Sequence, residues 1–292
     1  MLIKILKSTS EWLGIYNNIR YSRLYYWVLK YKNPNYIQSL NEDLAFYRRA
    51  LSDSLRLVFD VGANIGDKTW VFKQIATSVV CVEPDKSCFA VLRTRYSRDK
   101  SIRLENVALG DQIGEATFFM EEEGSCYSTL SEKQKNWLLS NHRLAQFQEV
   151  KVATSTLDGL IAKYGTPDFL KIDVEGYELP VFNGLSHFIP VISFEANLPR
   201  FREETFRILE RFRERESTRY NLMQRHDFLF PSHQRYDRVI DVLNRDEVIT
   251  YDVFVYNRAS IRHISKLTSR GTRRRFYGVH ATPCKVTSAL HG

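Results

Sequence analysis

Short apolar runs alternate with segments of helical periodicity through the middle of the chain. The runs that read as buried strands are Leu57–Val61, Val79–Glu83, Ile102–Leu109, Phe169–Ile172 and Val191–Phe194. The segments between them that read as helices are Lys68–Ile75, Ser87–Tyr96, Leu157–Lys163 and Phe201–Arg215. Strands that alternate with helices of this length predict an α/β protein with a parallel, doubly wound sheet.

Two further pairs of strands interrupt or close this pattern. Glu115–Met120 and Glu149–Thr154 are expected to pair around an inserted segment, in which Ser131–Phe147 is predicted to be helical. Tyr220–Gln224 and Tyr251–Tyr256 are expected to form a closing antiparallel pair, with a helix over His233–Asn244 between them.

The two ends of the chain differ from the centre. Residues 11–32 are aromatic and basic with helical spacing, and a second helix is predicted over Leu40–Leu51. Residues 257–292 carry eight basic side chains and no acidic one, with Arg258, Arg262, Lys266 and Arg270 four residues apart. We therefore expect an N-terminal helical extension (1–52), a central domain (53–257) and a basic tail (258–292). The basic ends suggest peripheral contact with an anionic membrane, although a solvated tail is an equally simple interpretation, and no nucleic-acid motif accompanies them.

Composition fits a globular protein. Of 292 residues, 43% are hydrophobic and 26% are charged, which is enough apolar material for a large core. No uninterrupted run of about 18 apolar residues predicts a transmembrane helix, and the N-terminus lacks the features of a secretory signal. The four cysteines (Cys81, Cys88, Cys126 and Cys284) have no zinc-ligand spacing and are expected to be reduced, so a cytoplasmic location is predicted.

Candidate chemistry begins directly after the first predicted strand. Asp60, Gly62, Asn64, Gly66 and Asp67 fall at the carboxyl end of that strand, where parallel sheets bind ligands. Glycines let the backbone turn tightly and approach a ligand, and Asp67 is placed to cap the next helix. A dinucleotide site requires a third glycine that is missing here, and the flanking carboxylates would repel a pyrophosphate. They suit the ammonium and sulfonium of S-adenosylmethionine, although an ordinary strand–helix turn would have the same spacing.

An acidic residue about 20 positions further on strengthens this interpretation. Glu83 ends the apolar run of the second strand, where a carboxylate can accept hydrogen bonds from both ribose hydroxyls. The loop and the acid together predict a nucleoside-containing cofactor more specifically than either feature alone.

Six short motifs in order resemble the FkbM-type family of class I methyltransferases. They are DVGANIGD (60–67), EPD (83–85), NVALGD (106–111), TLDGL (156–160), KIDVEGYE (171–178) and FEAN (194–197). The resemblance covers about residues 55–200 and implies a Rossmann-like, seven-stranded, mostly parallel sheet and S-adenosylmethionine-dependent methyl transfer, typically to a hydroxyl oxygen. By the same resemblance, Asp60, Gly62, Asn64, Gly66 and Asp67 would line the methionine end, and Glu83 would hold the ribose. Asp85, Asn106 and Val107 would meet the adenine. Family members often carry His where this chain has Asn197.

The acceptor half of the reaction is expected at the ends of the later strands. Asp173 and Glu175 follow the fourth strand of the predicted sheet, and Glu195 and Asn197 follow the fifth. Asp173 or Glu195 is a candidate general base, while the carboxylates and the Asn197 amide also suit Mg²⁺. Alternatively, Asp173 and Glu175 cap a helix that starts near Gly176. His226 is a weaker candidate base.

The inserted segment Glu121–Ser140, with Tyr127, Ser128 and Trp137, is either a lid over the acceptor or a structural excursion. The function expected overall is O-methylation of a glycan or a natural-product hydroxyl. An NAD-dependent oxidoreductase and a non-catalytic scaffold of the same fold are the competing hypotheses.

Overall fold

The computed structural model describes residues 34–51, 54–121, 127–141, 145–213, 217–245 and 248–257. The helix predicted over residues 11–32 and the basic stretch 258–292 lie outside these described residues, and so does any membrane contact they make. The division into three parts therefore stays a prediction. Within the described ranges, every helix is too short or too polar to cross a membrane.

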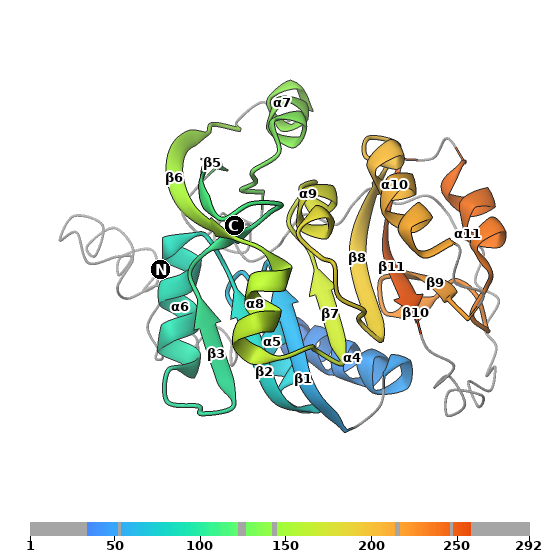
Figure 1. Ribbon diagram of the computed structural model, residues 1–292, viewed down its shortest axis with the longest axis horizontal. Coiled ribbons are helices and arrows are strands. Elements are labelled where there is room, and N and C mark those ends of the chain that lie inside the picture. Colours follow the sequence, from blue (N-terminus) through green and yellow to red (C-terminus); the bar gives the residue numbers. More distant parts are fainter. Residues whose placement is uncertain are drawn as a thin grey trace.

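An eight-stranded sheet forms the centre of the molecule (Figure 1). Strands β1, β2, β3, β7 and β8 pair in parallel, and β11 runs antiparallel to both β8 and β9. Across the sheet the order is β10-β9-β11-β8-β7-β1-β2-β3. The strands are β1 Leu55–Val61, β2 Ala76–Val82, β3 Ile102–Glu105, β7 Phe169–Ile172, β8 Val191–Leu198, β9 Arg219–Gln224, β10 Asp227–Phe228 and β11 Ile249–Tyr256. The predicted α/β fold is confirmed. Seven strands make the mostly parallel sheet, and β10 adds two residues at its edge.

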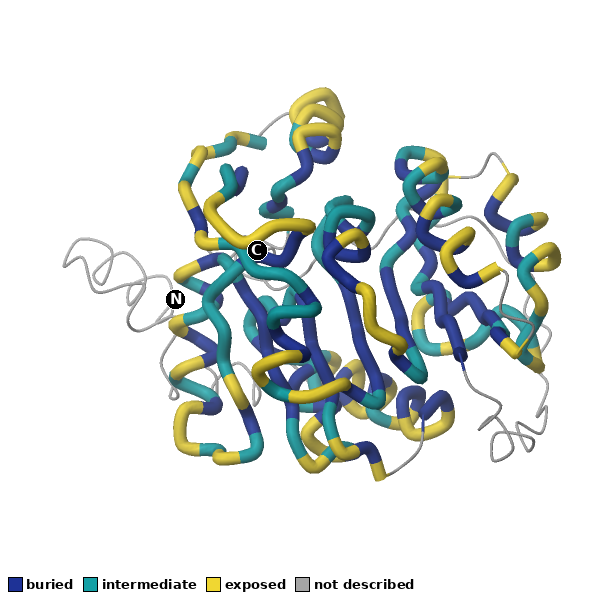
Figure 2. The backbone as a smooth tube through the Cα atoms, in the orientation of Figure 1, coloured by how far each residue is buried: buried dark blue, intermediate teal, exposed yellow. Residues whose placement is uncertain are grey.

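Helices cover both faces of this sheet. One face packs against α4 Pro34–Ala50, α5 Asp67–Phe72 and α6 Lys86–Tyr96, and the other against α8 Leu157–Tyr164, α9 Glu178–Asn183, α10 Arg202–Arg213 and α11 Tyr236–Leu243. The central strands are buried along most of their length (Figure 2). Burial on both faces explains why these strands are continuous apolar runs rather than alternating ones.

Helix α4 begins six residues earlier than the predicted start at Leu40, and it is fixed by aromatic packing. Phe46 and Tyr47 are 1% exposed and pack edge-on against Phe254 and Phe72, respectively. Burying an aromatic side chain of this size contributes roughly 1.5–3 kcal/mol. The N-terminal helix is therefore part of the core and lies beside the loop that follows β1.

The run Ile102–Leu109, predicted as one strand, is two strands in two sheets. After β3 the chain turns at Asn106, whose side-chain amide donates to the carbonyl oxygens of Glu83 (2.8 Å) and Pro84 (3.1 Å). β4 Ala108–Leu109 then pairs in parallel with β6 Gln148–Ser155, which is antiparallel to β5 Gly114–Met120. The predicted β5–β6 pair is confirmed.

Helix α7 Glu132–Asn141 lies between β5 and β6 in the sequence and is shorter than the predicted helix. In Figure 1, β5, β6 and α7 lie beyond the carboxyl ends of the parallel strands. The inserted segment is therefore on the side of the molecule where ligands of parallel sheets bind.

Candidate functional site

The loop between β1 and α5 depends on two glycines with positive φ. Gly62 has φ +74°, and a Cβ there would lie 1.7 Å from the carbonyl oxygen of Asp173. Gly66 has φ +85°, and its Cβ would lie 2.6 Å from Leu92 of α6. The absence of both side chains lets the loop pack directly against the end of β7 and against α6.

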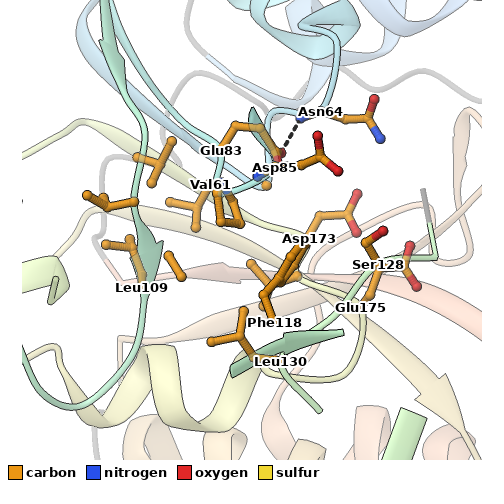
Figure 3. A pocket seen from close by; sticks show the side chains of 16 residues that line it. Val61, Asn64, Glu83, Asp85, Leu109, Phe118, Ser128, Leu130, Asp173 and Glu175 are labelled. Carbon is orange, nitrogen blue, oxygen red and sulfur yellow. Dashed lines mark hydrogen bonds between the residues drawn. The ribbon is translucent and has the colours of Figure 1, made fainter. Parts of the chain in front are cut away.

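Glu83 directly follows β2 and is held by two backbone amides. Its Oε2 accepts from the amide of Asn64 (2.8 Å) and its Oε1 accepts from the amide of Asp85 (2.9 Å), as Figure 3 shows for Asn64. The residue is 7% exposed, and this burial raises the pKa of Glu83 to about 7, even though both amide bonds favour the ionised form. Glu83 therefore lies beside the glycine loop, and its binding to a ribose stays a prediction.

A pocket of about 690 Å³, including its open mouth, lies between the loop, the end of β2 and the end of β7. Figure 3 shows the side chains around it, with Glu83 and Asp85 on one side and Asp173, Ser128 and Glu175 on another. The residues predicted to bind the cofactor that line it are Gly62, Asn64, Glu83, Asp85 and Val107. Its apolar walls are Val61, Val82, Leu109, Phe118 and Leu130. The pocket combines an apolar slot with carboxylates at defined points.

The other predicted cofactor residues lie behind this lining. Asn106 acts through its hydrogen bonds to the backbone at Glu83 and Pro84. Gly66 is the N-cap residue of α5, where Asp67 was expected to act as the cap. Asp67 is instead the first residue of the helix. Its Oδ1 accepts from the Tyr36 hydroxyl (2.5 Å) and from the buried guanidinium of Arg95 (2.9 Å). The carboxylate thus fastens the loop to α4 and α6.

Asp60 is fully buried beneath the pocket. Its Oδ2 accepts from the Thr69 hydroxyl (2.6 Å), and its Oδ1 lies 3.8 Å from the ammonium of Lys171. Burial raises the pKa of Asp60, while Lys171 and Thr69 act in the opposite direction. The Lys171 side chain is 5% exposed and also donates to Oδ2 of Asp173 (3.0 Å). One buried cation therefore joins Asp60 at the end of β1 to Asp173 after β7.

Three carboxylates meet beside the end of β7, two from the loop after β7 and one from within β8. Ligand atoms of Asp173, Glu175 and Glu195 lie within 4.8 Å of one another. Burial raises the pKa of Glu195 well above its ordinary value, and the charges of Asp173 and Glu175 raise it further. The structure therefore brings the two predicted catalytic residues together and adds Glu175 to them.

Asn197 lies outside this cluster. β8 continues to Leu198 because β11 pairs with it residue by residue, so Glu195 and Asn197 lie within the strand rather than after it. The Asn197 amide donates to Glu195 Oε2 (2.6 Å), and its oxygen accepts from Thr250 (2.6 Å). The Asn197 side-chain oxygen, the atom that would bind a metal ion, already accepts this hydrogen bond from Thr250.

The loop after β7 is held by a residue that the sequence interpretation overlooked. Helix α9 begins at Glu178 rather than near Gly176, so Asp173 and Glu175 do not cap it. The buried Glu178 carboxylate accepts from the amides of Val174 and Gly176 (3.2 Å each). Glu175 has φ +53°, a strained conformation that these bonds support.

The inserted segment reaches the same cluster. Ser128 and Leu130 line the pocket, and the Thr129 hydroxyl donates to the carbonyl oxygen of Glu175 (2.8 Å). Gln134 of α7 donates to Glu175 Oε2 (3.3 Å). The segment is thus one wall of the site. Gln134 had no signal in the sequence, because only the fold brings it beside Glu175.

His226, the weaker candidate base, contacts helix α4. Its ring nitrogens lie 3.3 Å from Glu42 and 3.3 Å from Asp43, both on α4. The ring of His226 is therefore engaged with the N-terminal helix, and its role as a base stays a prediction.

Comparison with known proteins adds a family. The model of the methyltransferase FkbM domain matches residues 60–230, which is more than half of the chain. Among curated proteins, no sequence matches.

Three of the solved structures that match this chain are distant from it in sequence. A precorrin-6y C5,15-methyltransferase from Geobacter metallireducens is 8% identical, with 76% of this chain and 87% of that chain covered and a TM-score of 0.40. An O-methyltransferase from Bacillus cereus in complex with SAH is 13% identical (75% and 80% covered, TM-score 0.37). The plantazolicin methyltransferase BpumL with SAH and a substrate analogue is 9% identical (86% and 95% covered, TM-score 0.41). Because these TM-scores are below 0.5, the family of this chain is assigned from the family-model match alone.

Proposed function

This chain belongs to the FkbM methyltransferase family, and from that premise we propose that it transfers the methyl group of S-adenosylmethionine to a hydroxyl oxygen of a glycan or natural-product acceptor. The single observation that carries the proposal is the Glu83 carboxylate, fixed by two backbone amides at the rim of a pocket that follows a glycine loop. An oriented strand-end carboxylate of this kind binds the two hydroxyls of a ribose.

The residues present fit the proposed donor. Asp85 caps α6 through Oδ1, and its buried Oδ2 has no hydrogen-bond partner among the described residues. That oxygen is suited to accept from an adenosine group. The acidic surroundings of Asp60 and Asp173 suit a ligand that carries an ammonium and a sulfonium, because Lys171 alone does not balance their charge. When bound, S-adenosylmethionine supplies a methyl group that is activated by the positive charge on sulfur.

On the acceptor side, we assign Asp173 as the general base. Lys171 holds Oδ2 of Asp173, so the other carboxylate oxygen is the one available to an acceptor hydroxyl. When Asp173 accepts the hydroxyl proton, the acceptor oxygen becomes a better nucleophile. The walls of the site would hold this oxygen in line with the methyl group. Glu195, whose pKa is raised, is better suited to hold a proton and to donate a hydrogen bond to the acceptor.

A divalent ion such as Mg²⁺ is the alternative role for the three carboxylates. It would lower the pKa of the acceptor hydroxyl in place of a base. We favour the direct base because Lys171 and Arg200 already supply positive charge at the cluster. Asn197, the third predicted ligand, is bound to Thr250.

Calorimetric titration of the full chain tests the donor assignment. We expect saturable binding of S-adenosylmethionine and S-adenosylhomocysteine, and weaker or undetectable binding of NAD. Tight binding of NAD alone would favour an oxidoreductase. Binding of the donor without methyl release over a panel of hydroxyl acceptors would favour a scaffold.

A further inference from the structure

Glu175 follows β7 in the sequence, but the inserted segment holds it in place. The Thr129 hydroxyl donates to the carbonyl oxygen of Glu175 (2.8 Å), and the Gln134 side chain donates to its Oε2 (3.3 Å). Thr129 is 1% exposed and exchanges two backbone hydrogen bonds with Phe119 of β5 (2.8 and 3.0 Å), so it is itself fixed to the smaller sheet. The position of the Glu175 carboxylate therefore depends on the inserted segment as well as on the end of β7.

Among the described residues, every charged side chain that lines the pocket is a carboxylate. These side chains are Glu83, Asp85, Asp173 and Glu175. Carboxylates in a partly enclosed pocket repel an anion and attract a cation, because protein around a charge screens it less than water does. The pocket therefore suits a ligand that carries positive charge.

The four carboxylates divide between two sides of the pocket (Figure 3). Glu83 lies on one side, where it is proposed to bind a ribose. Asp173 and Glu175 lie on the other side, and their ligand atoms are within 4.8 Å of each other. That side adjoins the glycine loop, because a Cβ on Gly62 would lie 1.7 Å from the carbonyl oxygen of Asp173. A ligand whose ribose binds to Glu83 and that fills the pocket therefore reaches Asp173 and Glu175 with its other end.

Of these two carboxylates, Glu175 is the better partner for an ammonium group. The Lys171 ammonium already donates to Oδ2 of Asp173 (3.0 Å), and Asp173 is the assigned base. Glu175 accepts from the neutral amide of Gln134, which orients the carboxylate without neutralising its charge. Arg200, on which the charge of Glu175 acts, does not line the pocket. Glu175 therefore provides an oriented negative charge at this end of the pocket.

We propose that Glu175 binds the α-ammonium of S-adenosylmethionine and that Thr129 and Gln134 are positioning residues that hold its carboxylate at the pocket. This inference rests on the proposed methyltransferase function and adds to it a residue that recognises the amino-acid end of the donor. The inserted segment then contributes to donor binding in two ways, since its Ser128 and Leu130 also line the pocket.

Calorimetric titration of the full chain with two ligands tests the contact. The ligands are S-adenosylhomocysteine and its deaminated analogue, in which a hydrogen atom replaces the α-amino group. We expect the unsubstituted chain to bind S-adenosylhomocysteine at least about ten-fold more tightly than the analogue, because the analogue lacks one hydrogen bond between charged groups. In Glu175→Gln this preference should fall to about three-fold or less, while affinity for the analogue does not fall. Glu115→Gln is the matched control and should keep the full preference, because Glu115 is an exposed acid of β5 outside the pocket lining.

The positioning role of the inserted segment has its own variants. Thr129→Val removes the hydroxyl that bonds to Glu175 and keeps the shape of the side chain, whereas Thr129→Ser keeps the hydroxyl. We expect Thr129→Val to lower the preference for S-adenosylhomocysteine over the analogue at least about two-fold, and Thr129→Ser to retain it. Gln134→Leu should lower the preference in the same way, because it removes the donor to Oε2 of Glu175. A residue with only a structural role would change both affinities alike and leave their ratio unchanged.

Two outcomes would overturn the inference. One is equal affinity of the unsubstituted chain for the two ligands, and the other is a preference that Glu175→Gln leaves unchanged. An unsubstituted chain that binds neither ligand would contradict the proposed function as well. Failure of the ammonium contact alone, with S-adenosylhomocysteine still bound, is therefore distinguishable from failure of the donor assignment.

Discussion

The ammonium of Lys171 lies 3.8 Å from Oδ1 of Asp60, a buried oxygen that accepts no hydrogen bond from any described residue. The cation therefore supplies the main compensation for that charge. We expect Lys171→Met to lower the free energy of unfolding by about 3–5 kcal/mol, the usual cost of leaving one partner of a buried pair uncompensated. Urea denaturation at neutral pH measures this change.

Two further variants check that the loss is electrostatic. Adding Asp60→Asn to Lys171→Met should recover part of the stability, because the uncompensated charge is gone. Lys163→Met breaks an exposed ion pair with Glu105 and should cost less than about 1 kcal/mol. A double variant no more stable than Lys171→Met alone would contradict this account.

Gly62→Ala should destabilise the chain strongly. Its new Cβ would lie 1.7 Å from the Asp173 carbonyl oxygen, so the loop or the end of β7 must move. We expect a loss of about 3–5 kcal/mol, as for a severe steric conflict in a packed region. Gly165→Ala is the control. Gly165 also has positive φ (+90°), but nothing lies within 4 Å of its Cβ position, so only about 1–3 kcal/mol of backbone strain is expected. Equal losses in the two variants would exclude the steric explanation.

Affinity for S-adenosylhomocysteine should depend on pH through Glu83. Burial raises the pKa of Glu83 to about 7, and the ionised carboxylate is the form that accepts from two ribose hydroxyls. Affinity should therefore rise about ten-fold between about pH 6 and pH 8, and this rise should disappear in Glu83→Gln. The effect on folding has the opposite direction. The native pKa lies above the unfolded value, so Glu83 favours the native state less as pH rises from about 4.5 to about 7. Calorimetric titration with S-adenosylhomocysteine between about pH 6 and pH 8 measures the change in affinity. An affinity that does not change with pH in the unsubstituted chain would contradict the assignment of Glu83 to the ribose.

Asp173→Asn should abolish most methyl transfer while sparing the donor site. Loss of a general base typically lowers kcat by about 10²–10⁴-fold. Affinity for S-adenosylhomocysteine should fall far less than kcat, because the amide retains the shape of the side chain and Asp60 still provides a negative charge near the ligand ammonium. Single-turnover methyl release with an acceptor that the unchanged chain methylates gives the rate. Near-normal turnover by the Asp173→Asn variant would show that Asp173 is not the general base.

Removal of divalent ions should leave methyl transfer intact. Under the direct-base mechanism, exhaustive dialysis against EDTA changes the rate less than about two-fold, because Lys171 and Arg200 provide the counter-charge. Loss of activity that Mg²⁺ restores would establish the alternative, with Asp173, Glu175 and Glu195 as ligands.

Much of the proposed site for S-adenosylmethionine was predictable from the sequence, because its loop and its acidic residue depend on local features of the chain. The glycine spacing of the loop requires Gly62 and Gly66 to have positive φ, and both do. Glu83 ends an apolar strand, and in a parallel sheet that position faces the neighbouring loop. Such features depend on residues close in the chain or on register between adjacent strands.

The remaining features depend on contacts between distant segments. Asp67 is held by Tyr36 and Arg95, each about 30 residues away, so its side chain fastens the loop instead of lining the pocket. Gln134 meets the carboxylate cluster only because the inserted segment folds back over it, and Trp137 of the same helix then packs against Arg200. Hydrophobic periodicity carries no information on such pairings.

The inserted segment leaves β5 at Met120 and returns to β6 at Gln148, and these two residues pair directly across the antiparallel ladder. Its two ends are therefore neighbours, so segments of different length and chemistry can be exchanged there without altering the strand register. A chimaera that carries a foreign segment between Met120 and Gln148 should keep this strand pairing, while the pocket wall that Ser128 and Leu130 form changes with the segment. In evolutionary terms, this wall of the pocket is free to diversify while the sheet beneath it stays the same.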